Sequence, residues 1–211
     1  MTSAAAQARA GPPRSRYDGA VRISFAIMAR RIRQGASLAV LLSALAGCHG
    51  RAPAGRYEKD GVAFDHLAGW SVTGDIQKNA RTIVVEGPEH AVMAFSVFAP
   101  SQEVSLDGYI QAATKSRAAG VERRLGIAGG AVADTTAPAR TTRAILGANV
   151  AGFDQHFTID LLNAHVPHTV EYFLTAIGTR AVIFMDQVPD AHRSKVDAGF
   201  QKIFDTLTVT R

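Results

Sequence analysis

Alternating apolar and polar positions predict about six strands in the second part of the chain, arranged as an antiparallel sheet with at least one face on a core. The first of these segments contains Asp60-Gly61, which suits a short hairpin or a bulged strand. A core side chain is expected at Trp70 in the next segment. The segments, seven when the hairpin-like first one is included, lie at residues 57–64, 69–72, 82–86, 93–98, 156–161, 170–175 and 181–188.

Two stretches with helical spacing of apolar residues predict helices that flank this sheet. The first follows Ser105, a suitable cap, and Gly120 is available to end it. Its apolar positions are Leu106, Tyr109, Ile110 and Ala113. The second begins at Pro189-Asp190 and carries an apolar stripe of Val196, Phe200, Ile203, Phe204 and Leu207. The fold class expected is α+β, an α/β/α sandwich.

An export signal precedes this domain. Leu45-Ala46-Gly47-Cys48 follows an uncharged apolar run, residues 36–46, and a cationic head at residues 28–33. These are the parts of a signal peptide that ends in a lipobox, which is cut before a cysteine whose sulfur is acylated. The run is too short to span a bilayer, which takes about 20 residues. A buried apolar helix with a chance cysteine is the alternative, and it leaves the adjacent arginines unexplained.

The signal divides the chain into four parts. Residues 1–27 are a mis-called start or a disordered leader, and whether Met1 or Met28 is the true start stays open. Residues 28–47 are the lipoprotein signal peptide, and residues 48–55 are a tether containing Pro53. Residues 56–211 form a single α+β domain, since the chain from Cys48 onward is long enough to bury a substantial core.

Charge and cysteine content exclude several classes of function. The chain has 23 lysines and arginines against 18 acids, but residues 1–47 hold seven of the arginines and one acid, which leaves 16 bases against 17 acids. The mature protein therefore lacks the basic character of a nucleic-acid-binding protein. Cys48 is the only cysteine, and acylation would consume it. We expect no disulfide, no cysteine nucleophile and no thiolate ligand.

Catalytic and cofactor motifs are missing from the sequence. There is no Gly-x-Ser-x-Gly, no His-Glu-x-x-His and no dinucleotide-binding glycine pattern. Residues 126–130 are glycine-rich, yet Ala131-Val132 follows where a phosphate loop needs lysine and a hydroxyl residue. We expect no enzyme and no cofactor, although acid pairs can assemble from distant strands.

One cluster could bind a metal or a small ligand. His165 and His168 are three residues apart in a stretch predicted to be a turn, with Asp160 and Glu171 close in sequence. Imidazole and carboxylate groups are zinc ligands. The alternative reading, two solvated turn histidines, is the one we prefer, so no resident metal is predicted.

The order of elements resembles the Mog1/PsbP/DcrB-like group over residues 57–211. The features that carry the resemblance are Phe64 with Gly69-Trp70, a hairpin, a helix of the Ser105-Leu106-x-x-Tyr109 kind, a meander and a terminal Phe200-x-x-Ile203-Phe204 helix. The resemblance implies an α/β/α sandwich around an antiparallel sheet. It also implies an envelope protein without established enzymatic activity, and it assigns no functional residue here.

The sequence therefore predicts a membrane-anchored envelope lipoprotein on the periplasmic face, acting as a non-catalytic interaction or accessory module. Its expected partners are membrane lipid, through acylated Cys48, and an unknown envelope protein, with no nucleic acid. A metal- or small-ligand-binding envelope protein is the alternative, and a hydrolase comes third. Inner and outer membrane are both open.

Overall fold

The computed structural model describes residues 53–77, 80–100, 102–125, 131–161 and 164–210. The predicted leader, signal peptide and lipobox, including Cys48, lie outside these residues, as does the glycine-rich stretch 126–130. The first strand begins at Gly55, the last residue of the predicted tether.

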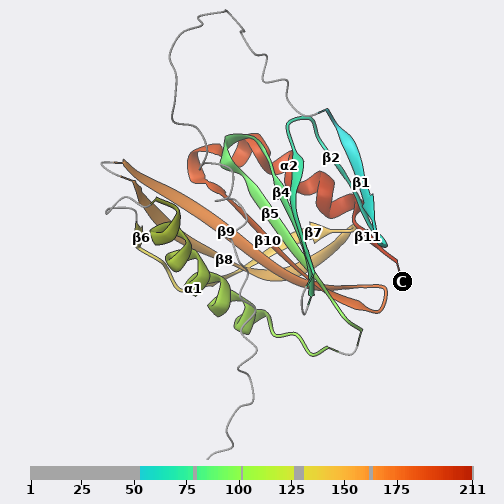
Figure 1. Cartoon of the computed structure of the whole chain (residues 1–211). Coiled ribbons are helices and arrows are strands. Elements are labelled where there is room, and N and C mark those ends of the chain that lie inside the picture. The colour runs from blue at the N-terminus through green and yellow to red at the C-terminus, as the bar shows by residue number, and fades with distance from the viewer. Residues whose placement is uncertain (1–52, 78–79, 101, 126–130, 162–163, 211) are drawn as a thin grey trace, which may run out of the picture.

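Two antiparallel sheets make up most of the structure (Figure 1). The small sheet has the order β1-β2-β11, from β1 (Gly55–Lys59), β2 (Val62–His66) and β11 (Thr208–Val209). The large sheet has the order β3-β4-β5-β10-β9-β8-β6, and β7 also pairs with β8. Its strands are β3 (Ser71–Gln77), β4 (Ala80–Glu86), β5 (Val92–Phe98), β6 (Ala131–Ala133), β7 (Ala139–Ile145), β8 (Ala148–Leu161), β9 (Ala164–Ile177) and β10 (Arg180–Pro189).

A helix packs on each face of the large sheet (Figure 1). Helix α2 (Arg193–Thr206) and the small sheet cover one face, and α1 (Leu106–Leu125) covers the other. Successive side chains of a strand point to opposite faces, so in β10 Phe184 packs in the core under α2, whereas Met185 packs under α1. The antiparallel α+β fold with helices on both faces is confirmed.

The expected number of strands was too low. Eleven strands occur in the described residues. The expectation was lower because the short strands β6 and β11 and the strand β7 have no recognisable sequence pattern. Strand β7 is exposed along most of its length, so its sequence does not alternate between apolar and polar residues. Helix α1 also continues past Gly120 to Leu125. A single glycine weakens a helix without necessarily ending it.

Two local predictions are confirmed. Asp60 and Gly61 connect β1 to β2 with φ angles of 46° and 77°, the left-handed pair that a tight hairpin requires. Ser105 caps α1, since its Oγ accepts a hydrogen bond from the backbone N–H of Gly108 at 3.2 Å.

Trp70 anchors α2 to the large sheet. Its ring is buried, with its centre 5.1 Å from that of Phe200. Gly87 and Gly199 pack so closely against the ring that a Cβ atom on Gly199 would come within 2.2 Å of it. Glycine is therefore required at this point of α2 by close approach rather than by backbone conformation.

Arg81 joins the two sheets. From β4 it donates hydrogen bonds to Asp75 of the large sheet and to the backbone carbonyls of Lys59 and Asp60 at the β1–β2 turn. The guanidinium of Arg81, with Lys59 and Tyr57, holds the pKa of Asp75 well below its usual range. The small sheet is thus fixed by a paired charge as well as by its apolar face.

One glycine from each helix, Gly199 of α2 and Gly108 of α1, provides a matched test of this packing. Gly199→Ala should lower the free energy of unfolding by about 1 to 2 kcal/mol, because overpacking typically costs about 1 to 3 kcal/mol and exceeds the helix propensity gained, about 1 kcal/mol. Gly108→Ala gains the same propensity, and its Cβ would meet nothing closer than 3.7 Å. Denaturant unfolding should therefore show opposite signs for the two variants. Equal stabilisation by both would contradict the packing of Trp70 on Gly199.

Candidate functional site

Three carboxylates lie in one row across three adjacent strands, on the face covered by α2. Asp154 of β8 is directly opposite Glu171 of β9, and Glu171 is directly opposite Asp186 of β10. Like charges in directly opposed positions destabilise a sheet. The row therefore needs compensating cations.

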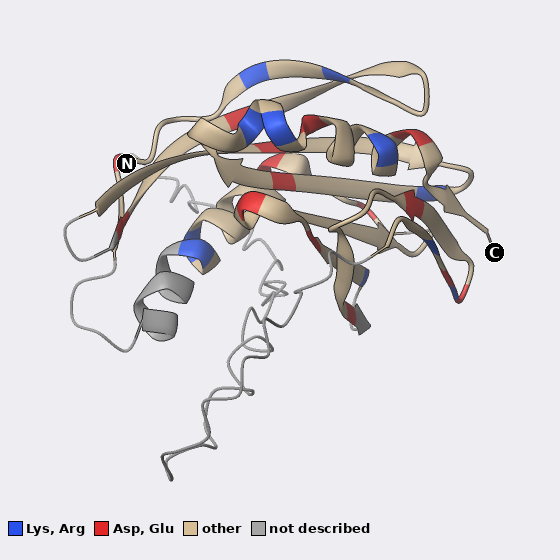
Figure 2. Cartoon of the chain, turned by 90° about the horizontal axis from the view of Figure 1, so that it is seen from above, with Lys and Arg blue, Asp and Glu red and all other residues tan. Residues whose placement is uncertain are grey.

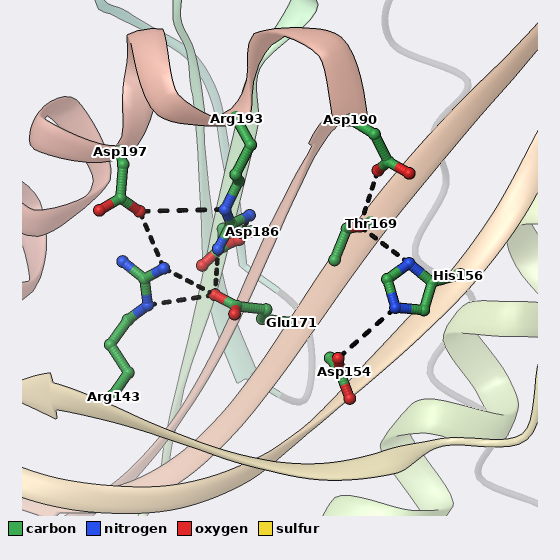
Figure 3. Close-up of polar contacts among 9 residues, drawn as sticks. All are labelled: Arg143, Asp154, His156, Thr169, Glu171, Asp186, Asp190, Arg193 and Asp197. Atoms are coloured by element: carbon green, nitrogen blue, oxygen red, sulfur yellow. Dashed lines mark hydrogen bonds and ion pairs between the residues drawn. The ribbon is translucent and has the colours of Figure 1, made fainter.

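Two arginines, one from β7 and one from the first turn of α2, pair with Glu171 and Asp186 of this row (Figure 3). Arg143 donates to Glu171 at 3.1 Å and to Asp197 at 2.9 Å. Arg193 bridges Glu171 and Asp186. Arg143, Arg193, Glu171, Asp186 and Asp197 form what we call the carboxylate–arginine cluster. It carries three acids and two bases, so one negative charge is left over if all are ionised.

Asp186 is the most deeply buried member of the cluster. Its side chain is 0% exposed, and within the described residues its Oδ2 accepts no hydrogen bond. Burial raises the pKa of Asp186 to about 7, helped by the negative charge of Glu171 and opposed by the two arginines. A carboxyl group in such a site is readily protonated near neutral pH.

A second polar chain lies beside this cluster (Figure 3). Thr169 Oγ1 is 2.7 Å from Asp190 Oδ1 and 3.0 Å from His156 Nδ1, and His156 Nε2 is 3.6 Å from Asp154 Oδ2. We call these four residues the histidine line. An ionised carboxylate can only accept, so Thr169 donates to Asp190 and His156 donates through Nδ1 to Thr169.

The histidine line has the composition of a catalytic triad but not its hydrogen-bond direction. A nucleophile has to donate its proton to the base, whereas Thr169 donates to Asp190 and receives a hydrogen bond from His156. The side chain of His156 is 53% exposed, so the line also lacks a water-excluded environment. Its geometry suits a surface link between β8, β9 and η3 (Asp190–His192).

The predicted metal cluster is divided between the two faces of the sheet. His165 and His168 lie within β9, not in a turn, and their positions place them on opposite faces. His165 is paired with Asp160 at 2.7 Å. Glu171 lies six residues further along β9, about 20 Å from His165, where it binds the two arginines. The described residues contain no group of three histidine, cysteine, aspartate or glutamate side chains placed to hold a metal ion.

His168 is a core residue, which corrects the expectation of a solvated turn. It is 7% exposed and stacks on Phe157 with ring centres 5.2 Å apart. Its Nδ1 lies 2.8 Å from the carbonyl oxygen of Val166. Burial lowers the pKa of His168, so its ring is neutral at pH 7.

Under α1 lies a polar group that sequence reasoning missed. Arg117 is buried and donates to the hydroxyl of Tyr172 and to Gln155 Oε1. Its guanidinium also lies over the ring of Phe157, 4.2 Å from the ring centre. Gln155 in turn donates to the carbonyl of Thr136 at 2.9 Å. Both acceptors are neutral, and the arrangement holds α1 against β8 and β9.

Sequence signals existed for only part of these sites. Asp186 is the only charged residue in the mostly apolar segment 181–188, and a charge at such a position indicates a buried ion pair. Arg143 gave no signal because β7 was not recognised. No sequence rule links Asp154, Glu171 and Asp186, which meet only through strand register.

Comparison with known proteins finds no matching family model and no matching curated protein. Among solved structures, the chain is similar to cyanobacterial PsbP (CyanoP) from Synechocystis sp. PCC 6803, with 11% identity over 78% of this chain and 96% of that one and a TM-score of 0.42. A Bacteroides thetaiotaomicron VPI-5482 protein has 12% identity over 77% of this chain and a TM-score of 0.43, and the match spans 49% of that protein.

LpqN, involved in cell envelope biogenesis of Mycobacterium tuberculosis, is also similar, with 8% identity over 79% of this chain and 88% of that one and a TM-score of 0.32. At these scores and identities the likenesses establish neither a family nor a function. No helix in the described part of the chain is long and apolar enough to cross a membrane.

Asp186→Asn should change how stability depends on pH. The pKa of Asp186 is about 7 in the folded protein against an ordinary 3.8, so the folded state holds the extra proton between those values. Its free energy of unfolding then falls as pH rises through that window. Each pKa unit corresponds to about 1.4 kcal/mol, so from about pH 5 to pH 8 the wild type should lose on the order of 1 to 4 kcal/mol relative to the variant.

Melting midpoints at both pH values measure this difference. Asp205→Asn, at an exposed position of α2, is the control and should follow the wild type. If the melting midpoints of the wild type and of Asp186→Asn changed equally with pH, Asp186 would not gain a proton on folding.

The two histidines of β9 should behave differently when replaced singly. His168→Ala should lower the free energy of unfolding by about 1 to 3 kcal/mol because it removes a buried, stacked ring. His165→Ala should change it by less than about 0.5 kcal/mol, since that side chain is 76% exposed. Thermal unfolding with and without added zinc checks this. If zinc stabilised the wild type and each single substitution abolished that effect, the placement of His165 and His168 on opposite faces of the sheet would be contradicted.

Proposed function

We propose that this protein is a lipid-anchored bacterial envelope protein, attached through Cys48, whose domain acts as a non-catalytic interaction or accessory module. The observation that carries the proposal is the sequence Leu45-Ala46-Gly47-Cys48 behind an apolar run and a cationic head. A folded domain begins seven residues after Cys48, at Gly55. That spacing suits a short connection between an acylated cysteine and the first strand.

The polar chemistry of the described residues supports a module without catalysis. The carboxylates of the carboxylate–arginine cluster are occupied by Arg143 and Arg193. Thr169, the one hydroxyl beside a histidine in the histidine line, donates to Asp190 rather than to His156. Each cluster therefore holds strands and helices together, and neither presents an activated nucleophile.

Membership of the Mog1/PsbP/DcrB-like group is part of the proposal. The element order over residues 57–211 supports it, as does the placement of Trp70, Phe200 and Phe204 in the core under α2. We infer that the partner is another envelope protein. The rival function of metal or small-ligand binding loses support because His165 and His168 point to opposite faces.

Cys48→Ser tests the anchor. The variant should lose acylation, measured by mass spectrometry of the mature N-terminus, and should leave the membrane fraction almost completely. Each buried methylene of an acyl chain contributes about 0.8 kcal/mol of membrane affinity, so loss of the chains removes most of the attachment.

His49→Ala is the matched control, since it alters the next residue and leaves the lipobox intact. It should remain acylated and bound to the membrane. Recovery of wild-type protein in the soluble fraction, cut at another site, would contradict the proposed lipid anchor. Crosslinking of the lipidated protein in cells, followed by affinity recovery, then tests for the partner.

A further inference from the structure

Strand β7 forms an outer edge of the large sheet. It pairs with β8 on one side, and no other strand in the described residues pairs with it. In Figure 2 the β7–β8 hairpin lies along one side of the molecule, and β7 carries two basic positions and no acidic one. Half of the backbone N–H and C=O groups of an edge strand have no partner within the sheet, so such a strand can pair with a strand of another chain.

The turn between β7 and β8 shows which backbone groups of β7 face outward. Its two residues, Leu146 and Gly147, have φ angles of 52° and 76°. The residues that flank such a turn form a hydrogen-bonded pair, and these pairs alternate along an antiparallel ladder. The backbone groups of residues 140, 142 and 144 therefore face away from β8. A side chain of α2 agrees with this alternation, since Gln201 Nε2 donates to the carbonyl oxygen of Ala144 at 3.0 Å.

The two edges of the large sheet differ in how well they could accept another strand. At the opposite edge, β3 is interrupted by a bulge between Val72 and Gly74, and bulges hinder strand addition. Strand β7 has no such shift over its seven residues. Within the described residues, the hydrogen bond from Gln201 to Ala144 is the only one made to its outward backbone groups. The outward groups of Arg140 and Thr142 are therefore open to a partner strand.

A second copy of β7 could pair with the first in several antiparallel registers, each defined by the residue at the two-fold axis. An axis at Arg140 or Arg143 would place two guanidinium groups directly opposite each other, and like charges in such positions destabilise a sheet. An axis at Thr142 would require the carbonyl of Ala144 to accept from the second copy. That carbonyl already accepts from Gln201, so these three registers are disfavoured.

An axis at Thr141 meets neither obstacle. It places Thr141 opposite its own copy and Arg140 opposite Thr142, whose outward backbone groups can then bond each other. The next outward pair is Ala144 with Pro138, which directly precedes β7. Proline has no N–H to donate, and the carbonyl of Ala144 needs none because α2 of its own chain donates to it. The N–H of Ala144 can still donate to the carbonyl of Pro138. The donors and acceptors of this edge therefore match those of a second copy.

We infer that the protein forms a symmetric dimer in which the β7 strands of two copies pair antiparallel about Thr141 and join the two large sheets. Main-chain hydrogen bonds provide the affinity in strand addition, and directly opposed threonines stabilise a pair of strands. The same patch serves on both copies, so the contact closes at two. The inference goes beyond the proposed function and does not depend on the anchor at Cys48.

Cysteines at two neighbouring threonines test the register. The Cα atoms of the two residues at the axis would be about 4.5 Å apart, a separation that a disulfide can span. Thr141→Cys should therefore give an intermolecular disulfide when the full chain is purified and mildly oxidised, seen as a dimer on a non-reducing gel. Thr142→Cys is the matched control and should stay monomeric, because it lies opposite Arg140 and not opposite itself. The wild type, with Cys48 alone, gives the background.

Charges introduced at Thr142 test the same contact without cysteines. Thr142→Arg places a guanidinium opposite Arg140 of the second copy, twice in each dimer. The dissociation constant of the dimer, measured by sedimentation velocity, should therefore rise on the order of 2- to 30-fold. Thr142→Glu places a carboxylate there and should lower it by a similar factor. Thr73, which is exposed on β3 at the opposite edge, is the control position, where neither Thr73→Arg nor Thr73→Glu should change the dissociation constant.

Three results would overturn the inference. They are a wild-type protein that sediments as a monomer at every concentration, stronger crosslinking through Thr142→Cys than through Thr141→Cys, and equal responses to Thr142→Arg and Thr142→Glu. If Thr141→Cys did not fold, the responses to the two charges at Thr142 would still decide, since that side chain is exposed in the single copy. A monomeric protein that is acylated at Cys48 would refute the dimer and leave the proposed anchor intact.

Discussion

The bridge that Arg193 makes between Glu171 and Asp186 fixes the relation of α2 to the large sheet. Three carboxylates in register across β8, β9 and β10 would repel one another in a place where water is scarce. Guanidinium groups from β7 and from the first turn of α2 pair with two of them, Glu171 and Asp186. The start of the helix is thus tied to one row of the sheet. Apolar packing alone would let a helix slide along that face.

Farther along α2, shape replaces charge as the constraint. Trp70 fills the space that Gly199 leaves open and contacts Phe200 edge-on. The helix is therefore held at its beginning by ion pairs and near its middle by a close steric fit. The two constraints act on the same rigid element, so a change in one alters the geometry of the other.

Much of this fold could be predicted from the sequence, because its core strands and both helices follow strict periodicities. Phe184 and Met185 of β10 illustrate this, since each packs on the face that alternation assigns to it. Strand β7 could not be predicted, since its exposed side chains carry no pattern. The row of Asp154, Glu171 and Asp186 was beyond prediction for a different reason. It depends on the register of three strands, which one sequence without contacts does not specify.

The pairing of β11 with β2 has a consequence for the order in which the molecule is completed. Val62 pairs with Val209, and the backbone N–H of Thr210 donates to the carbonyl of Gly61. The second strand of the chain therefore pairs with residues almost 150 positions later. Because the chain is synthesised from its N-terminus, the β1–β2 hairpin is made early, without the strand that closes the small sheet. Contacts between such distant positions form slowly, because a long loop has to close before they are made. The small sheet, at the N-terminal edge of the domain, would therefore be the last part to become rigid.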